Sequence, residues 1–136
     1  MDTEIGFEVY LDQPYLDAIE LVASALKAEG FGVLTRIDVS ATLREKLGEI
    51  FRPYMILGAC NPMLSFRALT EDPVIGLMLP CNITVEEQSD GSSLVRIVNP
   101  EVMMKVGSLQ DSEVLSDVAK EARARLERLA EALAKG

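Results

Sequence analysis

The sequence predicts an α+β fold in which helices pack on one side of a largely antiparallel sheet. Two observations carry this prediction. Strand-like segments are interleaved with helix-like ones, and an Asp-Gly turn at 90–91 joins two of the strand-like segments directly. We expect the order β-α-β-(short α)-β-α-β-β-α in one domain covering residues 1–136, a length that can bury a core without disulfides or metal.

The first third of the chain is expected to supply two strands and two helices. Residues 5–9 alternate between apolar and polar side chains, which predicts a strand with one buried face. An apolar stripe over 16–26 predicts a helix, and the alternation over 31–39 predicts a second strand. Ser40 can cap a short helix over 41–47.

The segment 54–60 is continuously apolar and short, which predicts a central strand buried on both faces. It is followed by Asn61 and Pro62, a residue pair typical of a helix start, because Asn caps the first turn and Pro lacks an N–H that would be unpaired there. The helix is expected to reach Glu71, with an apolar stripe at Met63, Phe66 and Leu69.

A second apolar stretch covers 74–85 and is interrupted at Pro80. Because proline removes a ladder donor, we expect one strand here that lies at a sheet edge or is bulged near Pro80. The turn at 89–92 joins it to a strand over 94–98, and 101–105 can form one helical turn.

The last predicted helix covers 112–134. Its apolar residues recur at the i, i+3, i+4 spacing of a buried stripe. They are Leu115, Val118, Ala119, Ala122, Leu126, Leu129, Ala130 and Leu133.

Composition excludes several classes of function. The net charge of −9 argues against nucleic acid as a partner, because counterion release requires clustered Lys and Arg. No apolar stretch approaches the roughly 20 residues that span a bilayer, and the acidic first ten residues are unlike a signal peptide, so we expect a cytoplasmic protein that does not bind membranes. The absence of histidine excludes the usual catalytic triads and nearly all catalytic zinc sites.

Charge is distributed unevenly along the chain. Residues 1–35 sum to −6, whereas residues 36–67 sum to +2. The basic residues of the second range could form an anion pocket with the helix N-terminus at Asn61, or they could lie on a solvated face and pair with nearby acids. These residues are Arg36, Arg44, Lys46, Arg52 and Arg67.

Four segments together resemble the Domain of Unknown Function 302 family: FGVLTRIDV at 31–39, TLREKLG at 42–48, RPYMILGACNP at 52–62 and IGLMLPCNITV at 75–85. Members of that family are small bacterial and archaeal proteins. The resemblance implies a fold similar to the TATA-binding-protein-like α+β fold, and it implies no activity.

Cys60 ends a predicted strand one residue before a helix N-cap, an environment that lowers the pKa of a thiol. The alternative is a small buried apolar residue. Cys81 with Asn82 repeats the Cys60-Asn61 pair. If the two strands are neighbours, the thiols could bind a soft ion such as Cu(I) with help from a methionine at 63 or 78, although methionines there are more often packing residues. We expect free thiols rather than a disulfide, and we predict no metal and no cofactor.

Three classes of function remain open. The favoured one is binding of a small anion, a carboxylate or phosphate, near the Cys60-Asn61-Pro62 turn. The alternatives are a thiol enzyme or redox sensor using Cys60 and a structural protein without a ligand. The candidate binding residues are Cys60, Asn61, Arg44, Lys46, Arg52, Arg67, Cys81 and Asn82. We also predict a homodimer, because the apolar fraction of 49% is high for an open sheet with one helix layer.

Overall fold

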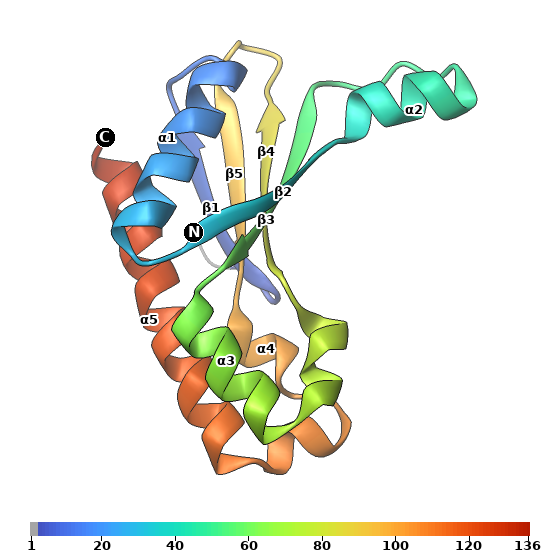
Figure 1. The fold of residues 1–136 in the computed structure, drawn as a ribbon. Helices are drawn as coiled ribbons and strands as arrows, with labels where there is room; N and C mark the ends of the chain where they lie inside the picture. The colour runs from blue at the N-terminus through green and yellow to red at the C-terminus, as the bar shows by residue number, and fades with distance from the viewer. Residues whose placement is uncertain (1–2) are drawn as a thin grey trace.

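The structure is a computed structural model that describes residues 3–136, and it contains a five-stranded antiparallel sheet (Figure 1). The strand order is β1-β5-β4-β3-β2, and each neighbouring pair is antiparallel. The strands are β1 (Gly6–Leu11), β2 (Gly32–Asp38), β3 (Tyr54–Cys60), β4 (Cys81–Glu87) and β5 (Ser93–Val98).

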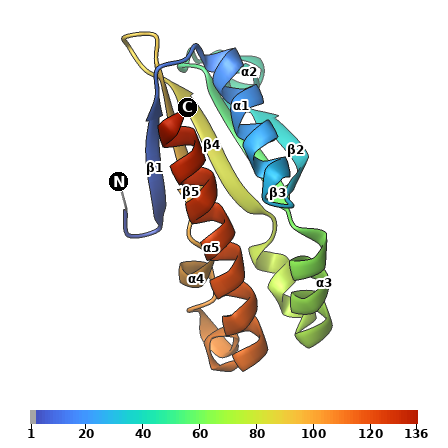
Figure 2. The ribbon, with the colours of Figure 1, turned by 90° about the vertical axis from the view of Figure 1, so that its left-hand side faces the viewer.

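The two longest helices, α1 (Tyr15–Ala28) and α5 (Glu113–Lys135), cover one face of this sheet (Figures 1 and 2). Two further helices, α3 (Pro62–Glu71) and α4 (Pro100–Met103), pack on α5 beyond one end of the strands. The short helix α2 (Val39–Leu47) projects from the opposite end. Two 3₁₀ helices, η1 (Pro73–Met78) and η2 (Gly107–Asp111), complete the chain. The predicted α+β fold is confirmed.

The core follows from the periodicity of the sequence. Alternate residues of β1, β4 and β5 point toward α1 and α5 and are buried, because successive side chains of a strand lie on opposite faces. The C-terminal half of α5 packs on the sheet, and its N-terminal half packs on α3 and η1 in a second, smaller cluster. The stripe predicted for this helix is buried as expected, apart from the half-buried Ala130.

The prediction of a strand over 74–79 is wrong. Asp72 accepts a hydrogen bond from the backbone N–H of Val74, and Pro73 occupies the first turn, so this apolar segment forms the 3₁₀ helix η1. β4 therefore begins at Cys81, after Pro80, and its ladder loses no donor. β4 is the middle strand rather than an edge strand, and β3 lies beside it in the interior of the sheet.

Two local predictions also need correction. Asp38 rather than Ser40 caps α2, because its Oδ1 accepts a hydrogen bond from the N–H of Ala41 at 3.0 Å. The predicted stripe of α3 faces solvent, with Met63 77% and Phe66 71% exposed. The buried face of α3 consists of Leu64 and Ala68, which pack in the cluster beside α5. On α1, Leu16 is likewise exposed although it belongs to the predicted stripe.

No helix within residues 3–136 is both long and apolar enough to cross a bilayer.

Candidate functional site

The two cysteines meet at one end of the sheet. Cys60 ends β3, and Asn61 then caps α3 by accepting a hydrogen bond from the N–H of Leu64 at 3.2 Å. Cys81 begins β4, and its Cα is paired with that of Ala59. The two strands are therefore neighbours, which is the condition on which the sequence-based soft-ion hypothesis depended.

Both cysteines line the same small cavity, whose walls also include residues of α3, α4 and α5. Its volume is about 30 Å³, and its lining is almost entirely apolar. Besides the two cysteines, its polar or polarisable lining residues are Asn61, Ser65, Met103 and Met104. A space of this size holds about one water molecule, so it can hold a single ion but no organic ligand unless the walls move.

The two thiols differ in their surroundings. Cys60 is half-buried, and its Sγ lies 2.9 Å from the Oγ of Ser65. Cys81 is buried, with 8% of its surface exposed. Burial, and secondarily the proximity of a charge on Cys60, raise the pKa of the Cys81 thiol to about 11. Cys81 is therefore protonated at neutral pH.

The cations predicted to surround the turn are not assembled there within one chain. Arg44 and Lys46 lie on α2, which follows the end of β2 where Asp38 is paired with Met55. Cys60 is at the other end of β3, five residues from Met55 and so about 17 Å away along the strand. Figures 1 and 2 show α2 and α3 at opposite ends of the molecule.

Arg52 also lies away from the turn, just before the start of β3, and it forms an ion pair with the buried Glu86. Glu86 accepts a second hydrogen bond from Arg96, at 2.5 Å. Burial alone would raise the pKa of Glu86, but the hydrogen bonds from Arg52 and Arg96 outweigh it, and the net shift of that pKa is downward. Arg52 therefore balances a structural carboxylate.

The remaining candidates are exposed. Arg67 lies on α3, six residues beyond Asn61. Asn82 directly follows Cys81, so its side chain is on the opposite face of β4 from the cavity. Of the sequence-based candidates, the structure thus brings together Cys60, Asn61 and Cys81.

Met103 and Met104 also line the cavity, and neither was among the sequence-based candidates. Both follow Asn99 and Pro100, which start α4 just as Asn61 and Pro62 start α3. β3 and β5 both pair antiparallel with β4, so they run parallel to each other and their C-terminal ends lie at the same end of the sheet. The Asn-Pro pair that follows each of these two strands was the sequence signal that could have placed Met103 and Met104 near Cys60.

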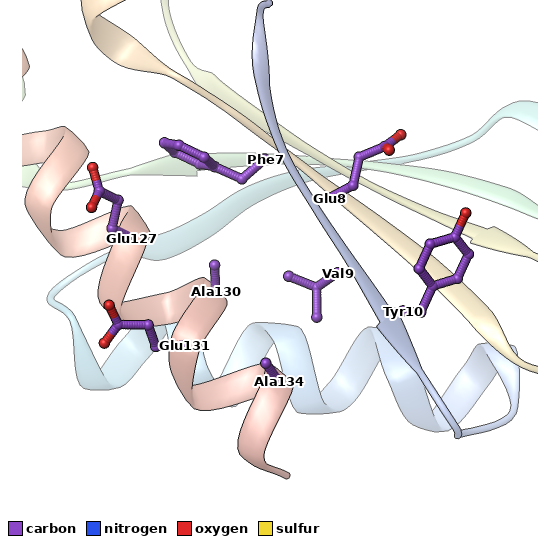
Figure 3. A pocket seen from close by; sticks show the side chains of 8 residues that line it. All are labelled: Phe7, Glu8, Val9, Tyr10, Glu127, Ala130, Glu131 and Ala134. Carbon is purple, nitrogen blue, oxygen red and sulfur yellow. The ribbon is translucent and has the colours of Figure 1, made fainter. Parts of the chain in front are cut away.

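A larger groove of about 440 Å³ lies between β1 and α5 (Figure 3). Figure 3 shows Phe7 and Val9 on the side of β1 that faces α5, with Glu8 on the other side. Glu127 and Glu131 line it from α5, and no basic side chain is among its lining residues. This groove does not suit an anion, and it contains none of the sequence-based candidates.

Residues 7–133 match the protein family described as Domain of unknown function DUF302. The chain belongs to this family. Among solved structures, the crystal structure of an uncharacterized conserved protein DUF302 from Bacillus stearothermophilus is similar, with a TM-score of 0.83 and 27% identity, over 95% of this chain and 98% of that chain. No curated protein matches the sequence. The DUF302 resemblance of the sequence motifs is confirmed, and it brings no assigned activity.

Proposed function

We propose that this DUF302 chain binds one soft monovalent metal ion, such as Cu(I), through the sulfur atoms of Cys60 and Cys81. The observation that carries the proposal is that Cys60 and Cys81 both line one cavity with room for about a single water molecule, and that Cys60 is close enough for its charge to raise the pKa of the Cys81 thiol. Thiolates and thioethers are the ligands that select Cu(I), and Met103 and Met104 are among the residues that line the same space.

The donor set argues against harder ions. Within residues 3–136, no group of three or more His, Cys, Asp or Glu side chains is arranged to hold a metal ion. A structural zinc site requires four such ligands. A soft monovalent ion is satisfied by two thiolates, so the pair Cys60 and Cys81 favours this ion class.

Binding is coupled to protons. Because the pKa of Cys81 is raised to about 11, its thiol carries a proton at neutral pH, and coordination to the ion releases that proton to solvent. The affinity for the ion therefore increases with pH, by about tenfold per unit for each proton displaced.

The test is an anaerobic titration of the reduced chain with Cu(I) against a competing chelator. We expect one ion per chain. Cys60→Ser and Cys81→Ser should each weaken binding by more than about 100-fold, because even outer-shell changes cost 10–100-fold in metal affinity. Met103→Leu, which keeps the volume and removes the thioether, should have a smaller effect.

The matched control is Met63→Leu, since Met63 is on the exposed face of α3. This variant should bind Cu(I) like the parent. The proposal would be wrong if Cys81→Ser bound Cu(I) as tightly as the parent, or if Met63→Leu weakened binding as much as a cysteine variant.

A second candidate function is thiol chemistry at Cys60 alone. It is favoured by the difference in accessibility, because Cys60 is half-buried at the start of α3 whereas Cys81 is buried and has a raised pKa. A charged alkylating reagent near neutral pH should then label Cys60 faster than Cys81. Equal or negligible labelling of the two cysteines in the folded, metal-free chain would exclude this candidate.

A further inference from the structure

A continuous segment of the chain has no buried residue. It comprises the nineteen residues from Gly32 to Ile50, that is, β2, α2 and the three residues that follow. The other edge strand, β1, is mostly buried. The segment is apolar in part, with Leu34, Ile37, Leu47 and Ile50 exposed. Folded structure with so little burial requires an explanation, because most helical stability in proteins comes from tertiary packing.

The helix α2 illustrates the problem. It has nine residues, and helices shorter than about 12–15 residues are marginal in water even when alanine-rich. Asp38 caps its start, and Gly48 ends it in the left-handed conformation with φ 68°. Its ends are thus well formed, while its sides contact little else, and Figure 1 shows it projecting from the molecule.

The charges of this segment indicate what covers it. The formal charges of this segment sum to zero, so the whole net charge of −9 lies elsewhere in the chain. Its charged residues are Arg36, Arg44, Lys46, Asp38, Glu45 and Glu49, of which Arg36 pairs with Glu20 of α1. A neutral surface with both signs is self-complementary, whereas the remaining, acidic surface would repel a second copy. The partner that fits is therefore another copy of this chain.

A second exposed apolar patch lies at the other end of the molecule. It consists of Met63 and Phe66 on the outer face of α3. β2 links the two features, because its start at Gly32 is paired with Cys60, next to α3, and its end at Asp38 leads into α2. The regular part of β2, from Thr35 to Asp38, pairs with β3 on one side and with no other strand among the described residues.

We propose that two copies of the chain associate along β2 about a two-fold axis, and that α2 of each copy packs on the exposed face of α3 of the other. In a two-fold pairing of identical strands the strands are antiparallel, so the end of β2 in one copy lies beside its start in the other. This places α2 of the partner copy next to Met63 and Phe66. A single two-fold operation thus covers the unpaired edge of β2, the exposed sides of α2 and the exposed patch on α3.

The size of the surface is sufficient. The nineteen residues of the segment, together with the α3 patch, approach the roughly 20–30 residues per side of a standard stable interface. The apolar residues lie where the two copies meet, and the cancelling charges lie among them.

The test uses sedimentation velocity of the full chain at micromolar concentration. The parent should sediment as a species of about 30 kDa, twice the 14.9 kDa of one chain. Leu47→Lys on α2 and Phe66→Glu on α3 should each weaken association by tenfold or more, because each places a charge in the apolar contact. Both positions are exposed in the single chain, so the variants should fold, which far-UV circular dichroism checks.

The double variant Leu47→Lys, Phe66→Glu should recover much of the lost affinity, because the introduced charges face each other between copies. The matched control is Leu16→Lys on α1, since Leu16 is 71% exposed and lies outside the segment. It should associate like the parent. A monomeric parent, a double variant no better than the single ones, or a control as weak as Leu47→Lys would each overturn the proposal.

Discussion

The buried thiol of Cys81 should make the chain lose stability at alkaline pH. Its pKa is raised from an ordinary 9.0 to about 11 in the folded chain. The folded state therefore keeps the proton in a range where the unfolded state releases it. The stabilisation is complete below pH 9 and is lost as pH rises toward 11. Between pH 8 and pH 10 this thiol lowers the free energy of unfolding by about 1.3 kcal/mol.

Urea unfolding of the reduced, metal-free chain at pH 8, 9 and 10 measures this loss. Cys81→Ala should remove most of the pH dependence, whatever it costs in absolute stability. Cys60→Ala should keep most of it, because burial is the larger cause of the shift. Tyr15, whose pKa is raised to about 12, adds about 0.4 kcal/mol over the same range, which Tyr15→Phe would remove. If Cys81→Ala showed the pH slope of the parent, the Cys81 thiol would not be shielded from water in the folded chain, and the inference from its burial would be wrong.

Two further predictions concern the sheet. Gly58→Ala should destabilise the chain by about 1–3 kcal/mol in urea unfolding, because the added methyl carbon would collide with the Oγ1 of Thr35 and lie 2.8 Å from the Cγ of Pro80. Gly76→Ala is the control, because the nearest surrounding atom to its added carbon is the Cδ2 of Leu69 at 3.8 Å, and an equal cost at both positions would contradict the steric argument. The lowered pKa of Glu86 implies stability that is present above pH 4.5 and lost as pH falls through the folded pKa. Glu86→Gln should reduce the loss of unfolding free energy between pH 6 and pH 3. An unchanged loss would show that Arg52 and Arg96 do not hold the Glu86 carboxylate ionised.

Local sequence signals predicted most of the fold. The Asn-Pro pair at 61–62, the turn at 89–92 and the stripe of α5 act over a few residues, so they could be recognised without tertiary contacts. The prediction for 74–79 was wrong because an apolar run of this length fits a strand or a short helix equally well, and of the residues in η1 only Ile75 is buried. The hydrogen bond that the Asp72 side chain accepts from the N–H of Val74 stabilises the start of η1 and so favours the helix.

The site was less predictable because it depends on register. The sequence-based prediction placed Arg44, Lys46 and Arg52 around Cys60 because these residues are near it along the chain. The antiparallel pairing of β2 with β3 instead places α2 a full strand length from Cys60. Conversely, Met103 and Met104 are more than forty residues from Cys60 and line its cavity.

The same register gives the sequence-based anion prediction one remaining route. Within one chain, α2 and the turn at Cys60 lie at opposite ends of β2. In the proposed two-fold pairing along β2 those ends are exchanged, so Arg44 and Lys46 of the partner copy would approach the start of α3, and Arg67 lies further along the same helix. A helix start flanked by added cations is an environment that favours an anion. The anion hypothesis therefore depends on the proposed association. If the parent chain sediments as a monomer, Arg44 and Lys46 cannot lie beside Cys60, and the anion hypothesis is wrong. The soft-ion proposal uses residues of one chain only, so that result would not affect it.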